Sequence, residues 1–415
     1  MIDEPILSVK NLRTTYYTDQ ETIRAVDGVS FTLRKRGSLG IVGESGSGKS
    51  VTARSILGLV DAPGKVHPDS EIRYHEPGFV EKMADRYPKA IRWSDRQDST
   101  DEGFIGIESG QETDDGVKVE SGWVDLVGAP ESVVKAARGS EIAMVFQDAQ
   151  TSLNPLYTVG NQIKELLKIH RGQRGREATE TAADLLESVG IPDPKRRLKE
   201  FPHQFSGGMQ QRATIALALA CDPSVLICDE PTTALDVTIQ AQILELLDEL
   251  QEERDLSIIF ITHDMGVIAH VARTITVMYA GEIVEVAPVY ELFEAPKHPY
   301  TRGLLESIPG RSLDEARLPT IEGSVPTPNT APTSCRYAPR CPKAFEECEA
   351  VHPALVDVGT ETVADTGEDS GPHTAACLLY PEELGIDDRL LVHEDVHHET
   401  ANPADPTMTG GSSDE

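Results

Sequence analysis

Positive charge and long apolar runs are both scarce in this sequence. Its 38 lysine and arginine residues stand against 69 aspartate and glutamate residues, which gives a formal net charge of −31. This balance disfavours a broad nucleic-acid-binding face, because attraction to phosphates requires the opposite sign. No stretch reaches the roughly 18 unbroken apolar residues that a membrane-spanning helix needs. Residues 1–10 also lack the pattern of a secretory signal, so we expect a cytoplasmic protein that reaches a membrane only through partners.

Aromatic residues are sparse as well, at 5% of the chain, and 39% of the residues are hydrophobic. The apolar residues nevertheless occur in clear runs, and 415 residues are enough for two or three domains with buried cores. Excess carboxylate with little lysine is typical of proteins from salt-loving organisms, in which strong screening tolerates self-repulsion. The alternative is an acidic protein of an ordinary organism with disordered tails.

The order of apolar segments predicts an α/β fold. Segment 39–42 leads into a glycine-rich loop and then a helical pattern, the beginning of an α/β unit. Further along, the apolar spacing predicts helices within 159–199 and at 210–220 and 239–252, and strands at 225–228, 258–261, 274–278 and 283–287.

Two acidic regions interrupt this regular pattern. Residues 67–120 lack a sustained period, and both a small folded insert and a partly disordered excursion are open for them. Residues 381–415 are acidic and end in glycine and serine, which predicts a disordered tail.

The glycine-rich loop has the phosphate-binding pattern G-x-x-x-x-G-K-[ST]. It reads Gly43, Glu44, Ser45, Gly46, Ser47, Gly48, Lys49 and Ser50, followed by Val51. Glycines let backbone N–H groups surround phosphates, Lys49 can reach the β- and γ-phosphates, and the Ser50 hydroxyl can bind Mg²⁺. A glycine-rich turn without a ligand is the alternative, but the flanking strand and helix favour the phosphate site.

Two further motifs lie downstream. A buried strand ends in Asp229 and Glu230, which places one carboxylate for a metal and the next for a water. Ser206, Gly207 and Gly208 open a helix and offer a second, exposed anion site. An ordinary helix cap is the alternative for Ser206.

With these three motifs in their order along the chain, the sequence resembles the nucleotide-binding subunits of ATP-binding cassette (ABC) transporters. The resemblance covers roughly residues 7–308 apart from the insertion. It implies a P-loop NTPase cassette with a RecA-like α/β core, an antiparallel β subdomain and a helical subdomain. The implied boundaries are 1–310 for the cassette with an insertion at 67–120, about 150–220 for the helical subdomain that carries the signature, 311–380 for a cysteine-containing C-terminal extension, and 381–415 for the tail.

The resemblance also implies roles for single residues. ATP and Mg²⁺ are the implied ligands, with Ser50, Gln147 and Asp229 arranging the metal. The implied catalytic residues are Glu230 as general base together with His263, Gln147 and Lys49. Tyr16 corresponds to the aromatic residue that stacks on adenine, although Tyr17 is adjacent. The signature residues Ser206, Gly207, Gly208 and Gln210, with Asp236 in the loop 234–236, are expected to contact ATP bound to a second subunit.

Several strings resemble the oligopeptide/dipeptide importers, and within them the "D" subunit rather than its "F" partner. These are Ser50-Val51-Thr52, Thr151 to Pro155, Pro202 to Met209 and His298 to Thr301. The implied partners are two transmembrane permease subunits, a second ATP-binding subunit in a heterodimer and an extracellular substrate-binding protein, with the chain peripheral on the cytoplasmic face of the membrane and no nucleic acid. Import of nickel or oligosaccharides, and a soluble ABC ATPase outside transport, are the alternatives. Ala149 stands where the family usually has proline.

Four cysteines follow the cassette at Cys335, Cys341, Cys348 and Cys377. A cytoplasmic location argues against disulfides, and grouped thiolates suit Zn²⁺ or an iron–sulfur cluster. The resemblance favours a [4Fe–4S] cluster over Zn²⁺. Four free thiols in a loop are the alternative, and Cys221 and Cys228 are expected to be packing residues.

Overall fold

A computed structural model describes residues 4–94, 103–113, 116–233, 235–308, 321–359 and 372–400. The chain divides into two compact units, one of Met1–Glu282 with Thr327–Thr330, the other of Ile283–Pro326 with Ala331–Glu415. In the described parts of the chain, no helix combines the length and the apolar character needed to cross a membrane.

A parallel sheet forms the core of the first unit. Its strands run in the order β12-β3-β11-β10-β9 and comprise β12 (Thr274–Tyr279), β3 (Ser38–Val42), β11 (Ser257–Thr262), β10 (Val225–Asp229) and β9 (Ile142–Val145). Strands β3, β10 and β11 are buried along their whole length, as expected for parallel strands covered on both faces. Their carboxyl ends meet at one edge of the sheet, where ligands bind in open α/β folds.

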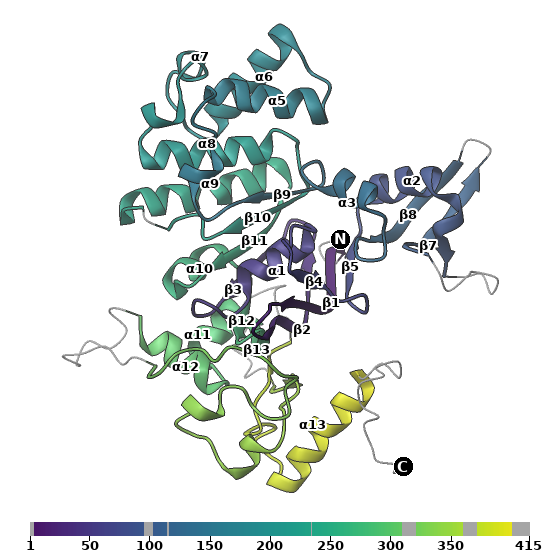
Figure 1. Cartoon of the computed structure of the whole chain (residues 1–415), viewed down its shortest axis with the longest axis vertical. Coiled ribbons are helices and arrows are strands. Elements are labelled where there is room, and N and C mark those ends of the chain that lie inside the picture. The colour runs from purple at the N-terminus through teal and green to yellow at the C-terminus, as the bar shows by residue number, and fades with distance from the viewer. Residues whose placement is uncertain are drawn as a thin grey trace. The chain divides into compact units, whose positions relative to one another are not determined.

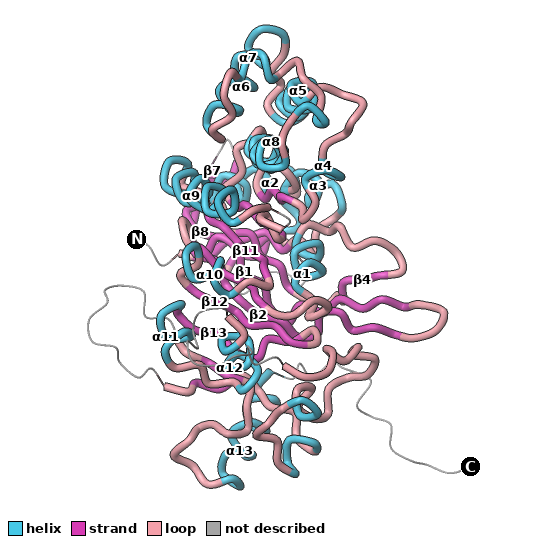
Figure 2. Tube along the Cα trace, turned by 90° about the vertical axis from the view of Figure 1, so that its left-hand side faces the viewer, coloured by secondary structure: helices cyan, strands magenta, loops and turns pink. Residues whose placement is uncertain are grey.

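Helices cover both faces of these strands. Helix α1 (Lys49–Ile56) contacts β10 and also strands of a second sheet, whereas α10 (Met265–Val271) contacts β3 and β11. Figure 2 shows α1 and α10 on opposite sides of the strands. The α/β core predicted from the sequence is therefore confirmed.

The second sheet of this unit is antiparallel over most of its strands. Its order is β2-β1-β5-β8-β7-β6, with β4 (Gly64–Val66) on β1. The strands are β1 (Pro5–Tyr17), β2 (Thr22–Arg34), β5 (Glu71–Tyr74), β6 (Ile91–Trp93), β7 (Ile105–Thr113) and β8 (Gly116–Asp125), of which only β6 and β7 pair in parallel. Helix α2 (Pro77–Arg86) and the short η1 (Pro88–Ala90) lie between β5 and β6.

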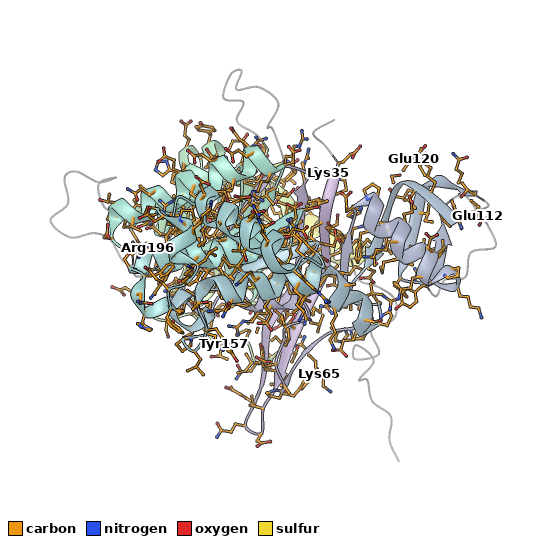
Figure 3. The ribbon with its side chains drawn as sticks, turned by 90° about the horizontal axis from the view of Figure 1, so that it is seen from above. Lys35, Lys65, Glu112, Glu120, Tyr157 and Arg196 are labelled. Carbon is orange, nitrogen blue, oxygen red and sulfur yellow. The ribbon has the colours of Figure 1, made fainter. Side chains whose placement is uncertain are left out.

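The acidic insertion is largely folded. Helix α2 buries Phe79, Val80 and Met83 and packs against β8, so a small apolar face supports a composition that otherwise resembles disorder. Glu112 and Glu120 lie at the outer side of this lobe, far from Tyr157 and Arg196 (Figure 3). Residues 95–102 and 114–115 of the predicted insertion lie outside the described residues.

Helix α3 (Glu131–Ala137) precedes β9. A helical layer follows β9 and comprises α4 (Ala149–Ser152), α5 (Val159–His170), α6 (Gly175–Ser188), α7 (Pro194–Arg197), η2 (Pro202–Gln204), α8 (Gly207–Leu219) and, after β10, α9 (Val237–Arg254). Helices α8 and α9 lie between the parallel strands and α5–α7 (Figure 1). Thr158 caps α5 by accepting from the Asn161 amide.

The second unit is built on a small antiparallel sheet in the order β13-β15-β14. It contains β13 (Glu282–Pro288), β14 (Val356–Asp357), β15 (Thr374–Ala375), α11 (Val289–Glu294), α12 (Pro299–Glu306), η3 (Ala338–Arg340), η4 (Glu346–Glu349) and α13 (Ile386–Thr400). Glu285 is fully buried here, and its Oε1 lies 2.7 Å from Nε2 of the buried His373.

Helix α13 corrects the prediction of a disordered tail over 381–415. His393 is fully buried, accepts from the Ala354 amide at 3.1 Å and bonds the Tyr380 carbonyl at 3.1 Å. Leu390, Val392 and Val396 pack against buried side chains of the second unit. The many acidic residues around them hide this apolar set in the composition, and residues 401–415 lie outside the described residues.

Candidate active site

The loop Gly43–Ser50 joins β3 to α1 and requires glycine at defined positions. Gly43, Gly46 and Gly48 have φ values of 154°, 83° and 103°, which favour glycine. A Cβ on Gly43 would lie 2.2 Å from the Met278 carbonyl oxygen, and one on Gly48 would lie 2.3 Å from that of Ala25. Both glycines therefore let the loop pass close to neighbouring backbone.

The Lys49 side chain bonds back to the start of the same loop. Its Nζ donates to the carbonyl oxygens of Gly43 at 2.7 Å and Glu44 at 2.9 Å, and the residue is 5% exposed. Burial lowers the pKa of Lys49, while the negative charges of Glu230, Asp229 and Glu44 oppose that shift. A phosphate that replaces the two carbonyl acceptors would meet an ammonium group already in position.

Ser47 provides an independent observation at the same loop. Its Oγ is buried and has no hydrogen-bond partner among the described residues. Buried hydroxyls are normally paired, so an unpaired donor here fits a loop that binds an oxygen-rich ligand.

Asp229 and Ser50 form the candidate metal-binding pair. Ser50 Oγ donates to Asp229 Oδ1 at 2.9 Å, and Asp229 is 2% exposed. Burial raises the pKa of Asp229, opposed by the Ser50 hydrogen bond and increased by the neighbouring Glu230 charge. Two hard oxygen donors at the end of the phosphate loop fit Mg²⁺, whose charge would favour the ionised carboxylate.

Glu230 receives three side-chain hydrogen bonds. Gln147 Nε2 donates to Oε2 at 2.9 Å, Thr233 Oγ1 donates to Oε2 at 2.8 Å, and His263 Nδ1 lies 3.0 Å from Oε1. Burial alone would raise the pKa of Glu230, but the hydrogen bonds from His263 and Thr233 and the charges of His263 and Lys49 outweigh it and lower the pKa. Glu230 is thus held as a carboxylate.

The geometry brings together six of the predicted residues: Lys49, Ser50, Gln147, Asp229, Glu230 and His263. Gln147, expected near the metal, directs its amide nitrogen to Glu230 instead of to Asp229. Thr233 was missed by the sequence reasoning. Its position three residues after Glu230, in the turn that follows a strand-terminal carboxylate, is the only sequence signal for it.

The signature residues form a separate group. Ser206 caps α8 and accepts from the Met209 amide at 3.4 Å, and Gln210 donates to the Pro202 carbonyl at 2.9 Å. Among the described residues, the hydrogen bonds of Ser206 and Gln210 stay within 202–210 and do not reach the phosphate loop.

Two side chains lie beside the start of the signature helix α8: Leu235 of the loop after β10 and Ile239 of α9. Asp236 caps α9 and accepts from the Ile239 amide at 3.1 Å, and a Cβ on Gly208 would lie 2.7 Å from Ile239 Cγ2. The Gly207 backbone faces Leu235, whose Cδ2 would lie 3.8 Å from an added Cβ. Ala234, part of the predicted crossing loop, lies outside the described residues.

Tyr16 and Tyr17 end strand β1. Tyr16 pairs with Ile23 and with Gly64, and a Cβ on Gly64 would lie 2.6 Å from Tyr16 Cε1, so the Tyr16 ring covers that glycine. Tyr17 is 51% exposed. Within the described residues, no side-chain hydrogen bond of Tyr16 distinguishes it from Tyr17 as the residue that stacks on adenine. That role stays a prediction.

The four C-terminal cysteines line one small cavity. Cys335, Cys341, Cys348 and Cys377 surround a volume of about 10 Å³ together with His298. Burial raises the pKa of Cys335 to about 11 and that of Cys377 to about 12, so these thiols are neutral. Across the described residues, no three histidine, cysteine, aspartate or glutamate side chains adopt metal-binding geometry. The cysteines are gathered, but not in ligand geometry.

The chain is similar to known transporter proteins over most of its length. Residues 26–104 and 99–233 match the family described as ABC transporter, and residues 284–348 match that described as Oligopeptide/dipeptide transporter, C-terminal region. A putative peptide import ATP-binding protein of Brucella melitensis is 44% identical over 366 residues, covering 86% of this chain and 95% of that protein. The oligopeptide transport ATP-binding protein AppD of Bacillus subtilis is 42% identical over 378 residues, covering 91% and 98%.

A solved structure is similar to the cassette alone. The dimeric structure of a bacterial ABC transporter cassette superposes with a TM-score of 0.50 at 25% identity, over 68% of this chain and 98% of that chain. The remaining third of the chain is therefore additional to that cassette.

Proposed function

The chain belongs to the ABC transporter family, and from this premise we propose that it is the ATP-hydrolysing subunit that drives peptide import through partner permeases. The observation that carries the proposal is the carboxylate of Glu230, held ionised by three donors beside Lys49 and the Ser50–Asp229 pair. A base, a cation and a metal-binding pair are the parts that phosphoryl transfer to water requires.

Each residue has a distinct part in the hydrolysis. Ser50 and Asp229 would hold Mg²⁺, which supplies positive charge against the phosphates of bound ATP. Lys49 neutralises charge that develops on the γ-phosphoryl group. Glu230 takes a proton from the attacking water onto its carboxylate, while Gln147 and Thr233 hold one carboxylate oxygen and His263 holds the other.

We infer that the active unit is a dimer in which the signature of one subunit completes the nucleotide site of the other. Among the described residues, the side chains of Ser206 and Gln210 bond only within 202–210, so their exposed helix N-terminus is available to a second subunit's nucleotide. The family resemblance favours a heterodimer with a related ATP-binding subunit, two permease subunits and an extracellular substrate-binding protein, with this chain peripheral on the cytoplasmic face of the membrane. The net charge of −31 favours a salt-rich cytoplasm.

We further propose that the cysteine cavity holds a [4Fe–4S] cluster, with Zn²⁺ as the less favoured occupant. The donor chemistry fits, because four thiols line one cavity and no carboxylate shares it. A volume of about 10 Å³ holds roughly one water-sized centre, so either group requires the thiolates to move apart and lose their protons. Cys335, Cys341, Cys348 and Cys377 would be the ligands.

The proposal is tested by a gentle-detergent pull-down of tagged protein in multimolar KCl, followed by reconstitution of the recovered complex in vesicles. Recovery of two polytopic permeases and a second ATPase, with ATPase activity stimulated by peptide and its binding protein, supports the importer. Stimulation by Ni²⁺ or oligosaccharides instead would identify those substrates as the cargo. Recovery of ribosomes, DNA or no partner would overturn the transport function.

A further inference from the structure

The acidic insertion contains a pocket that the hydrolysis of ATP does not use. Its volume is about 640 Å³, within the range of small-molecule sites, roughly 300–1,000 Å³. The residues that matter for its chemistry are Arg86, Tyr87, Lys89, Arg92, Phe104 and Asp125. None belongs to the phosphate loop, the signature or the residues around Glu230.

The charge of this pocket is opposite to that of the chain. Three cations, Arg86, Lys89 and Arg92, fall within seven residues of a protein with a net charge of −31. None of the three forms an ion pair with a described residue, whereas many other arginines of the chain do, including Arg73 and Arg171. The pocket therefore keeps its positive charge available.

The carboxylates near the pocket accept hydrogen bonds from backbone amides. On α2, Asp85 accepts from the Val117 amide at 3.1 Å and Glu81 from the Val119 amide at 3.4 Å, so both face the β7–β8 hairpin. Asp125 accepts from the amides of Ile72 and Val127, both at 3.1 Å. Asp125 lines the pocket, but among the described residues none of these three carboxylates forms an ion pair with Arg86, Lys89 or Arg92.

Arg92 adds a second, independent observation. Its Nε is buried and has no acceptor among the described residues. A buried guanidinium N–H is normally hydrogen-bonded. The Nε–H of Arg92 can therefore donate to an oxygen atom of a bound ligand.

The other wall of the pocket is aromatic. The rings of Tyr87 and Phe104 pack edge to face with centroids 5.5 Å apart at 69°, and the Tyr87 hydroxyl bonds Ser132 Oγ at 2.9 Å. Arg86 Cζ lies 5.5 Å from the Tyr87 ring centroid. Aromatic side chains next to cations without ion-pair partners among the described residues suit a ligand that has an aromatic body and an anionic group.

We propose that this pocket binds a small aromatic anion of nucleotide size, at a site separate from the ATP site. Arg86, Lys89 and Arg92 bind the anionic group, and Phe104 with Tyr87 contacts the ring. Adenosine monophosphate (AMP) is a suitable probe, because it lacks the β- and γ-phosphates that Lys49 contacts in a phosphate loop.

The chain contains its own reporter for the measurement. Its two tryptophans, Trp93 in β6 and Trp123 in β8, both lie in this lobe, and Trp93 directly follows Arg92. Titration of the full-length protein with AMP should give a saturable change in tryptophan fluorescence. The change should persist in a Lys49→Ala variant, which separates this site from the ATP site.

Matched variants test the lining. Arg86→Gln/Lys89→Gln/Arg92→Gln should weaken AMP binding at least tenfold, and the exposed Lys89→Gln alone should weaken it measurably without risk to folding. The control Lys168→Gln/Arg174→Gln/Lys195→Gln removes equal charge from exposed positions of the helical layer and should leave binding unchanged. Phe104→Leu should weaken AMP binding but not the binding of inorganic pyrophosphate.

Three outcomes would overturn the inference. One is the absence of a saturable signal with either probe, and another is equal AMP binding by wild type and by the folded triple variant. The third is AMP binding that is unaffected by Phe104→Leu, which would refute the aromatic half of the site. Loss of ATPase activity in the complex would leave these binding results unaltered, so the two proposals fail independently.

Discussion

Nδ1 of His263 lies 3.0 Å from Oε1 of Glu230, so the residue that follows β11 contacts the residue that follows the neighbouring parallel strand β10. Asp229 pairs with Ile261 in the register of β10 and β11, and the two strands end together. The contact therefore follows from strand register and needs no long loop to form it. The other carboxylate oxygen of Glu230 accepts from Gln147 and Thr233, which come from separate segments.

Replacing Glu230 by glutamine should abolish hydrolysis but not nucleotide binding. The amide keeps the shape of the side chain and cannot accept a proton, so we expect kcat to fall by about 100- to 10,000-fold. ATP affinity, measured by equilibrium binding to the same preparation, should change little. Normal turnover in this variant would refute the assignment of Glu230 as general base.

Thr233→Val should shift the pH dependence of hydrolysis. In the folded protein, burial raises the pKa of Glu230, but the hydrogen bonds of His263 and Thr233 lower it below its ordinary value. Removing one donor lets burial act with less opposition, so the pKa rises and the acidic limb of kcat/KM moves to higher pH. Thr233→Ser retains the hydroxyl and should restore the wild-type profile. An unshifted acidic limb in Thr233→Val would show that Thr233 does not tune this carboxylate.

Gly48→Ala should destabilise the protein more than Gly46→Ala. Both glycines have positive φ, which costs a residue with a Cβ about 1–2 kcal/mol. At Gly48 the new Cβ also meets the Ala25 carbonyl oxygen at 2.3 Å, whereas at Gly46 nothing lies within 4 Å. Thermal midpoints and urea denaturation of the two variants measure the difference. Equal losses would mean that the loop relaxes away from Ala25 without cost.

Loading of the cysteine cavity should depend on pH and on all four thiols. Burial raises the pKa of Cys335 to about 11 and that of Cys377 to about 12, so a metal must displace protons and its apparent affinity should increase as pH rises. Iron and acid-labile sulfide in anaerobically purified Cys348→Ser should fall well below wild type. Cys221→Ser, which changes a cysteine of the cassette, is the control and should retain wild-type content. Equal iron in both variants would exclude the cluster from this cavity.

The sequence predicted the strand or helix beside each motif, because each motif carries its own structural context. A strand precedes Gly43, a strand ends at Asp229, and Ser206 begins a helix, and all of these hold in the structure. Thr233 was invisible because a single threonine in a turn carries no pattern, and its hydrogen bond depends on how the chain turns after Glu230. The direction of the Gln147 amide was equally unpredictable, since it depends on tertiary contacts.

The acidic regions were harder to predict, for a reason that the buried residues make clear. Helix α2 needs only Phe79, Val80 and Met83 on one face, and α13 needs Leu390, Val392 and Val396 with the buried His393. Such short apolar sets disappear in the average composition of a strongly acidic segment. Counting charges therefore overestimated disorder within 386–400.

Ile239 of α9 connects the first turn of α9 to the first turn of α8. Its amide is bonded by Asp236 at the start of α9, and its side chain fills the space beside Gly208 at the start of α8. A side chain packed this closely against backbone transmits displacement rather than absorbing it. A displacement of the first turn of α8 must therefore displace the first turn of α9, which begins seven residues after Glu230 in the sequence. The first turns of α8 and α9 are thus expected to move together rather than independently.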